Sequence, residues 1–219
     1  MGLFEEHNRW SLKNHILSGI CFTQWIKLLW RYRKSVEWFR YGHRIIFLTI
    51  FSIFNSIISL PDTIFYHKKI KKQKINTRPI FILGHPRTGT THLFNLLSLN
   101  KQKFIFANTF QVGFPNAFLC TERYGSKILS PIIDKTRPMD NMALSFTVPQ
   151  EDELATNILS SGTSPYLYLV FPKAYSCIKN FFTFDNIPRH YFEEWTDSFT
   201  YFLKKVIFIY AFHLGHQAY

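Results

Sequence analysis

The segment 78–99 constrains the fold of this chain more than any other stretch of its 219 residues. It begins with RPIFILG at 78–84, a proline followed by a short apolar run ending in glycine, which is typical of a buried parallel β-strand. A turn, HPRTGTT at 85–91, comes next, and HLFNLLSL at 92–99 then places Leu93, Leu96 and Leu97 on one helical face. The order strand, turn, helix predicts an α/β unit with a turn suited to ligand binding.

The turn at 85–91 has the composition of an anion-binding site. Gly84 and Gly89 allow the backbone to come close to an anion. The first amides of the following helix lack intrahelical partners, and the helix dipole favours negative charge there. Thr90 and Thr91 add hydroxyl donors, and the guanidinium of Arg87 suits phosphate or sulfate oxygens. We favour this interpretation over a tight turn without a ligand.

The spacing of Gly84 and Gly89 matches the loop of nucleotide triphosphatases, G-x-x-x-x-G-K-[ST]. Thr90, however, occupies the position of the lysine that those enzymes place on the β- and γ-phosphates. A P-loop nucleotide kinase or NTPase is therefore a disfavoured alternative.

The pattern Pro86-Arg87-Thr88-Gly89-Thr90-Thr91 after a strand resembles the 5′-phosphosulfate loop of sulfotransferases that use 3′-phosphoadenylyl sulfate (PAPS) as donor. Three stretches resemble the broad prokaryotic-type branch of that family: FILGHPRTGTTHLFNLL at 81–97, KTRPMDNMAL at 135–144 and VPQEDELA at 148–155. The similarity runs from about residue 40 to about residue 207. It implies a P-loop-like α/β fold, a parallel sheet flanked by helices, and metal-free transfer of a sulfonate from PAPS to a hydroxyl acceptor.

The resemblance also implies roles for single residues. Arg87 stands where cytosolic sulfotransferases have a catalytic lysine, and it is expected to bind the bridging oxygen and the sulfonate as charge develops on the leaving phosphate. Thr88, Gly89, Thr90 and Thr91 match the residues that cradle the 5′-phosphate. The acceptor is left open between a lipid, a carbohydrate and a small alcohol, although the apolar N-terminal segment favours a lipophilic one.

Sulfonate transfer to an alcohol requires a group that accepts the hydroxyl proton. Glu151, Asp152 and Glu153 follow Pro149, which suits the first turn of a helix. Like charges this close raise at least one pKa, as a base requires, so we expect Glu151 or Glu153 to be the catalytic base. An equally good alternative is that the three acids only complement the helix dipole.

Residues 1–75 are predicted to form a basic, apolar helical segment. Helical spacing over 10–41 fits a surface helix covering the core, and less well a basic amphipathic helix on an anionic membrane. The uncharged run at 45–60 has 16 residues, fewer than the about 20 of a bilayer span, so a buried or interfacial helix is favoured. HKKIKKQK at 67–74 fits a solvated linker better than a contact with lipid headgroups.

The charge distribution and the cysteines indicate a binding partner and a cellular location. The net charge is +12, and residues 1–75 hold 13 Lys and Arg against 4 Asp and Glu, away from the anion loop. We therefore expect an anionic membrane surface rather than nucleic acid as a partner. Cys21, Cys120 and Cys177 are widely spaced, which predicts neither disulfides nor a zinc site and indicates a reducing, cytoplasmic location.

The expected organisation is the helical segment 1–75 followed by the N-terminal portion of a sulfotransferase domain at 76–219. A helix is expected at 192–207 and strands at 78–84 and 103–108, with a weaker strand candidate at 205–210. The Arg and Ser that form the family's 3′-phosphate site have no counterpart after residue 207, so the resemblance implies a C-terminally truncated chain of open activity. A non-catalytic, membrane-peripheral anion-binding protein is the main alternative from another class.

Overall fold

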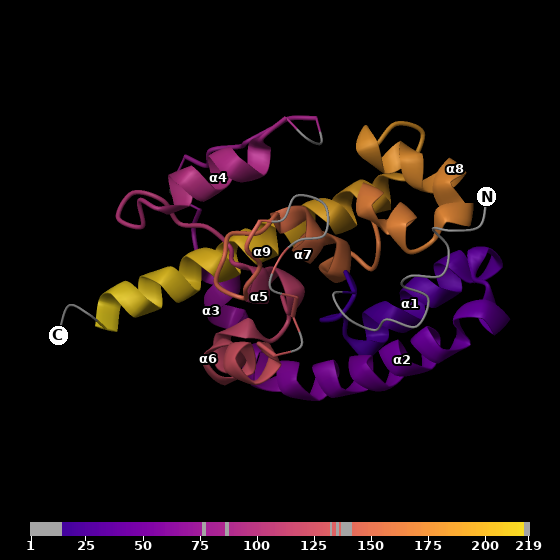
Figure 1. Cartoon of the computed structure of the whole chain (residues 1–219), viewed down its shortest axis with the longest axis horizontal. Coiled ribbons are helices and arrows are strands. Elements are labelled where there is room, and N and C mark those ends of the chain that lie inside the picture. The colour runs from indigo at the N-terminus through magenta and orange to yellow at the C-terminus, as the bar shows by residue number, and fades with distance from the viewer. Residues whose placement is uncertain are drawn as a thin grey trace.

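The structure is a computed structural model, and it describes residues 15–75, 78–85, 88–131, 133–134, 136 and 142–216, with side chains as far as residue 212. Over these residues the chain folds into helices joined by turns (Figure 1). The long helix α9 crosses the centre of the molecule, and α2 runs along one edge (Figure 1).

The N-terminal part folds into a helical hairpin. Helix α1 (Phe22–Tyr32) begins with a capping box between Cys21 and Gln24. A 3-10 turn, η1 (Arg33–Ser35), leads into α2 (Trp38–Pro61), which packs alongside α1. The helix predicted at 45–60 is therefore confirmed.

The helix continues beyond α2 without a break. A π-helical turn, η2 (Asp62–Tyr66), leads directly into α3 (His67–Lys72), whose Ile70 is fully buried. The prediction of a solvated linker at 67–74 is therefore wrong, because one apolar side chain in this basic run anchors a helical turn against α9.

The remaining helices fill the rest of the described chain. The middle part contains α4 (Thr90–Ser98), α5 (Thr109–Gly113), α6 (Phe118–Leu129) and α7 (Asp152–Leu159). The last part contains η3 (Pro165–Leu169), η4 (Pro172–Ala174), α8 (Tyr175–Ile178), η5 (Lys179–Phe182) and α9 (Arg189–His216). Helices α4 and α9 confirm the helices predicted at 92–99 and 192–207.

The predicted α/β fold class is wrong for the described part of the chain. Its residues contain no strand and no parallel sheet, and isolated antiparallel bridges join Asn108 to Pro149 and Thr136 to Ala143. A parallel strand is stable only when its neighbours satisfy its backbone hydrogen bonds and helices cover both of its faces. That condition is not met for any of the three expected strands.

Each expected strand has a different outcome. The segment 78–84 is not helical, but no described strand lies beside it, and Leu83 is 87% exposed. Residues 103–108 reach only an antiparallel bridge, at Asn108. Residues 205–210 belong to α9, where helical spacing turns Val206 and Ile209 into the core.

Two hydrophobic clusters form the core. The first joins α1 and α2 to the C-terminal turns, and its buried members are Leu17, Ile20, Trp25, Leu28, Tyr32, Leu48, Ile158, Leu167, Phe171, Ala174, Ile178 and Phe181. The second joins α5, α6, α7 and α9, and its buried members are Ala107, Phe110, Val112, Phe114, Phe118, Ala155, Phe202, Val206 and Ile209. The first cluster draws on both sides of the proposed domain boundary after residue 75, which stays a prediction.

A buried ion pair fixes α2, α6 and α9 against one another. Lys205 Nζ on α9 lies 2.8 Å from Asp62 Oδ2, and their side chains are 0% and 1% exposed. The Asp62 carboxylate also accepts hydrogen bonds from the amides of Leu119 and Cys120 in the first turn of α6. Lys205 donates a second hydrogen bond to the carbonyl of Pro115, so both buried charges have partners.

Candidate active site

The predicted anion loop lies directly before α4. Gly89, the residue before the helix, has a φ of +91°, which glycine adopts without strain. The amide of Leu93 donates to the Gly89 carbonyl at 3.0 Å. The amides of Thr90, Thr91 and His92 precede that bond, so they have no intrahelical acceptor and their dipoles face the loop. The N-terminus of α4 thus has the local geometry of an anion site.

The loop itself is tightly folded. Both the amide and the hydroxyl of Thr88 donate to the carbonyl of His85, at 3.2 and 2.7 Å. A Cβ atom on Gly84 would lie 2.6 Å from Thr90 Cγ2 and 2.8 Å from Thr88 Oγ1. A side chain at position 84 would therefore force the side chains of Thr88 and Thr90 to move.

The loop is open to solvent. His85, Thr88 and Gly89 are exposed, while Thr90 and Thr91 are half-buried. Pro86 and Arg87 lie outside the described residues, so the catalytic role expected of Arg87 stays a prediction. The roles expected of Thr88, Gly89, Thr90 and Thr91 also stay predictions, now with a loop geometry that suits them.

The loop and the acidic block lie close together. A crevice of about 10 Å³ is lined by Thr91 and Asn95 of α4, by residues 142–144 and by residues 148–150. It is too small for a nucleotide or an alcohol of similar size, but Thr91, at the end of the predicted anion loop, lies beside the residues that precede the three acids. The preceding residues 137–141 of the RPMDNMA block lie outside the described residues.

Backbone hydrogen bonds hold the segment before α7 in place. The amide of Thr109 donates to the Val148 carbonyl at 2.9 Å, and the amide of Gln150 donates to the Ala107 carbonyl at 3.0 Å. Because α5 is anchored in the second hydrophobic cluster, these bonds fix the position from which the acids project.

The three acids start α7, as predicted. Glu151 is the N-cap residue, and its carboxylate accepts a short hydrogen bond from the hydroxyl of Tyr166. Glu153 accepts a hydrogen bond from Trp195 Nε1 at 3.4 Å and interacts with the hydroxyl of Ser164. The two candidate bases, Glu151 and Glu153, therefore have different hydrogen-bond partners.

Burial is the main cause of the pKa shifts in this block. It raises the pKa of both Asp152 and Glu153, and the neighbouring acid raises each of them further. The sequence suggests like charge as the cause of an upward shift, whereas desolvation is the larger cause in the structure. Above these raised pKa values the carboxylates ionise and become able to accept a proton.

Two contacts of the acids cannot be found from the sequence. Tyr166 lies 15 residues from Glu151, and Trp195 lies 42 residues from Glu153. In the sequence, Tyr166 is one of many aromatic residues in the stretch 165–184, and Trp195 belongs to the apolar side of a helix. No local pattern links either residue to an acid, because the fold alone brings them together.

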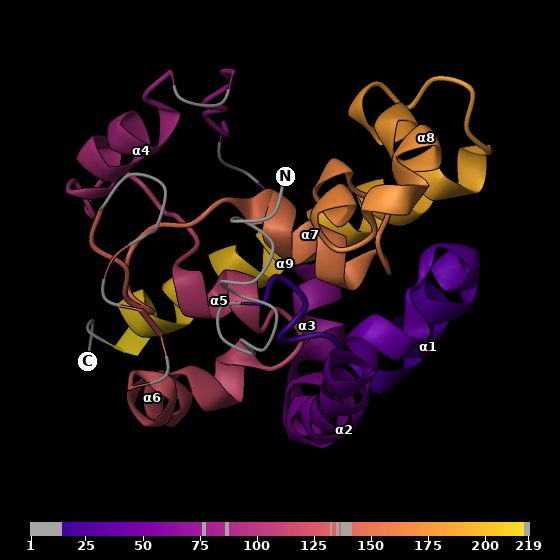
Figure 2. The ribbon, with the colours of Figure 1, turned by 45° about the vertical axis from the view of Figure 1, so that its right-hand side comes forward.

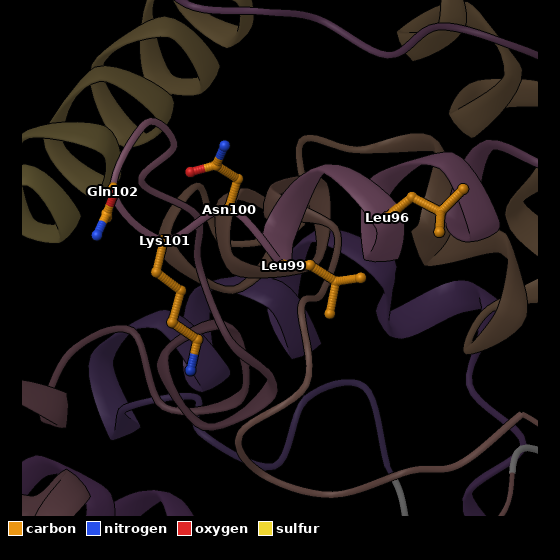
Figure 3. Close-up of a pocket in the computed structure, with 5 residues that line it drawn as sticks. All are labelled: Leu96, Leu99, Asn100, Lys101 and Gln102. Carbon is orange, nitrogen blue, oxygen red and sulfur yellow. The ribbon is translucent and has the colours of Figure 1, made fainter.

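A second, more open hollow among the described residues does not belong to this site. It has a volume of about 480 Å³ and lies at the C-terminal end of α4, lined by Leu96, Leu99, Asn100, Lys101 and Gln102. These side chains point in different directions rather than toward one centre (Figure 3). Since α4 has nine residues, about 13 Å of helix separates the hollow from the predicted anion loop.

The described residues contain no group of three or more His, Cys, Asp or Glu side chains that could hold a metal ion. Cys21, Cys120 and Cys177 are all free thiols. The described groups of the loop and the acidic block are amides, hydroxyls and carboxylates.

Comparison with known proteins identifies relatives. The chain is similar to the omega-hydroxy-beta-dihydromenaquinone-9 sulfotransferase Stf3 of Mycobacterium bovis and to the protein of the same name from Mycobacterium tuberculosis. Each is 32% identical over 194 residues, which cover 87% of this chain and 48% of the relative. The chain thus spans about half the length of the curated relatives it matches. No family model and no solved structure matches the chain significantly.

Proposed function

The relatives confirm the assignment of this chain to the sulfotransferase family, and from that premise we propose that it transfers a sulfonate group from PAPS to a hydroxyl acceptor. The observation that carries the proposal is the glycine-containing loop 84–91 at the N-terminus of an exposed helix. We propose a cytoplasmic location, where its three free thiols would stay reduced.

The loop is proposed to hold the 5′-phosphosulfate of the donor. The first-turn amides of Thr90, Thr91 and His92 would donate to the phosphate oxygens, and the hydroxyls of Thr90 and Thr91 would add further hydrogen bonds. Arg87 would stabilise charge on the oxygen that links sulfur to phosphorus as that bond breaks. No metal is needed for this step, because the loop and the guanidinium supply the charge stabilisation.

The transfer exchanges one sulfur–oxygen bond for another. The acceptor oxygen forms a bond to sulfur, the bond from sulfur to the phosphate oxygen breaks, and adenosine 3′,5′-bisphosphate leaves. The acceptor's hydroxyl proton passes to a carboxylate. We propose Glu151 as that base, because it directly follows the crevice shared with Thr91, whereas Glu153 is engaged with Trp195 and Ser164. Tyr166 would hold the Glu151 carboxylate in position.

We propose a lipophilic alcohol as the acceptor. By its name, the relative is a sulfotransferase of an omega-hydroxylated dihydromenaquinone, an isoprenoid quinone derivative with a terminal hydroxyl group. The large exposed apolar side chains along α2 in this chain support an acceptor of similar character.

A transfer assay tests the proposal directly. The purified chain is incubated with sulfur-35-labelled PAPS and a long-chain isoprenoid alcohol in detergent, and the organic phase is counted. The proposal predicts label in the lipid product, and none with Arg87→Ala. Equal labelling by Arg87→Ala would remove the loop from the mechanism, and label in water-soluble alcohols alone would contradict the acceptor class.

A further inference from the structure

Helix α2 has its polar side inside and its apolar side outside. Ser52, Asn55 and Ser59 are 0%, 2% and 8% exposed and face the protein. The outer stripe of α2 and η2 is apolar, and its members are Ile46, Ile50, Ile53, Phe54, Ile57, Leu60, Ile64 and Phe65, between 45% and 70% exposed. A surface helix of a water-soluble protein has the opposite arrangement, whereas helices in membranes often meet one another through small and polar residues.

The inward polar residues are bonded, so the orientation of α2 is fixed. Asn55 Nδ2 donates to the carbonyls of Ser18 and Ile20 at 2.6 and 3.1 Å. Ser56 Oγ accepts from the amide of Phe22 at 2.8 Å. Rotating α2 to bury its isoleucines would break these bonds and the Asp62–Lys205 ion pair at its end. The apolar stripe is therefore held outward by specific contacts.

Helix α1 extends the apolar face. Phe22, Ile26 and Trp30 recur every four residues on its outer side and are 39%, 43% and 70% exposed. Because the Phe22 amide is bonded to Ser56, this stripe lies beside that of α2. Helices α1 and α2 form one edge of the molecule in both views (Figures 1 and 2). Single exposed apolar residues are ordinary on protein surfaces, but a continuous patch across two helices marks an interaction site.

The charges around this patch complement an anionic lipid surface. No charged residue occurs between Arg44 and Asp62, a length of about 25 Å of helix. Four exposed lysines follow the stripe, namely Lys68, Lys69, Lys71 and Lys72, and the other end carries exposed Lys27, Arg33 and Lys34. Long basic side chains at the edge of an apolar face can reach lipid headgroups.

Aromatic residues stand at the same border. The guanidinium of Arg33 lies 4.7 Å from the Trp30 ring centroid, and Trp38 Nε1 donates to the Arg33 carbonyl at 3.3 Å. Trp30 and Trp38 are 70% and 48% exposed. Tryptophan beside basic residues is typical of the interface between lipid tails and headgroups.

We propose that the outer face of α1 and α2 binds an anionic membrane, with α2 lying in the plane of the bilayer surface. By length and composition alone, Trp38–Lys72 could also cross a bilayer. The in-plane orientation follows from the inner side of α2, which is bonded to α1 and, at its end, to α6 and α9. An in-plane helix buries one face in the headgroup and acyl boundary, which matches a helix with one apolar side. This inference concerns binding and does not depend on sulfonate transfer.

Vesicle flotation tests the proposal with the whole chain. Phosphatidylcholine vesicles with and without phosphatidylglycerol are compared for the wild type, for the triple variant Ile50→Glu, Phe54→Glu, Ile57→Glu, and for Leu99→Glu. Leu99 is 77% exposed and follows α4, on the opposite side of the molecule, so it is a matched control (Figures 1 and 2). We expect the wild type and the control to float with anionic vesicles and the triple variant to stay in solution. Because all three altered residues are exposed, the variant should keep its circular dichroism spectrum.

A second set of measurements distinguishes the electrostatic attraction of the lysines to the headgroups from the depth at which the helix inserts into the bilayer. Changing Lys68, Lys69, Lys71 and Lys72 singly to Gln should weaken binding about fivefold per lysine, with the loss disappearing at high salt. Quenching of tryptophan fluorescence by lipids brominated near the headgroup, rather than deep in the acyl chain, is expected for the in-plane orientation. Deep quenching would overturn that orientation. Absence of flotation by the wild type, or a dimer in sedimentation that the triple variant dissociates without any vesicle binding, would overturn the proposal.

Discussion

Lys205 and Asp62 form an ion pair of 2.8 Å with essentially no solvent contact, at the junction of α9, α6 and the end of α2. The two residues lie 143 positions apart in the sequence. The pair holds α2, the helix with the exposed apolar face, against α9, and α9 in turn packs on α7, the helix that begins at the acidic block. It is thus the structural link between the proposed membrane face and the proposed active site.

Breaking this pair should strongly destabilise the fold. Lys205→Met leaves the Asp62 carboxylate buried without its cation, and we expect a loss of about 3–5 kcal/mol in the free energy of unfolding by urea. Arg189→Met is the control, because its ion pair with Glu193 is on the surface, with side chains 90% and 57% exposed, and its loss should matter little. Equal effects of the two substitutions would contradict the role given to the buried pair.

Stability should fall in mild acid because of His15. Burial, assisted by the charge of Arg44, lowers the pKa of His15 to about 4. The folded state therefore favours the neutral imidazole, whose Nδ1 accepts from the amide of Leu17 at 3.2 Å. The neutral imidazole therefore contributes about 3 kcal/mol to the free energy of unfolding above the ordinary pKa of about 6.5. This contribution is lost as the pH falls from there toward 4.

Urea unfolding across this pH range measures the effect. His15→Gln should give a flatter profile between pH 7 and 4.5 than the wild type. A variant profile with the same slope would show that His15 is not the responsible group.

Glycine substitutions should show that donor binding depends on the anion loop and not on glycines elsewhere in the fold. A side chain at position 84 would collide with Thr88 and Thr90, so Gly84→Ala should weaken donor binding at least tenfold. Gly42 lies in α2, where an added Cβ atom would have no neighbour within 4 Å, and Gly42→Ala should bind normally and gain up to about 1 kcal/mol of stability. Calorimetric affinity and thermal unfolding measure both. Unchanged donor affinity in Gly84→Ala would argue against the loop as the donor site.

The two candidate bases should respond differently to neutralisation. Glu151→Gln should lose turnover by about 100-fold or more while keeping donor affinity, as expected of a general base. Glu153→Gln should keep most of its turnover, because its carboxylate is held by Trp195 and Ser164. Tyr166→Phe should lower turnover less than Glu151→Gln, since it removes a hydrogen bond that positions the base. The reverse order of Glu151 and Glu153 would transfer the role of base to Glu153.

Local features of the fold could be predicted from the sequence, and pairings between distant segments could not. The helices at 45–60, 92–99 and 192–207 follow from apolar spacing, and the start of α7 follows from Pro149 and the acids. The apolar run at 78–84 looks like a strand of the parallel sheet that the family resemblance implies, but a strand also needs partners, and the described residues provide none beside it.

The candidate site shows the same division. The glycines and threonines of the loop could be recognised in the sequence because their chemistry is local. The hydrogen bond between Tyr166 and Glu151 could not, because it joins residues that only the fold brings together. The outward apolar face of α2 was also hidden, since the composition of a helix does not say which of its sides meets the protein.

Calorimetric titration with adenosine 3′,5′-bisphosphate tests the central claim most directly, because this ligand presents the 5′-phosphate to the loop without any acceptor. We expect saturable binding that is lost in Arg87→Ala, with an unchanged unfolding temperature, and no comparable binding of ATP with Mg²⁺. Binding of ATP with Mg²⁺ in the absence of any binding of the bisphosphate would contradict the assignment of the loop to PAPS.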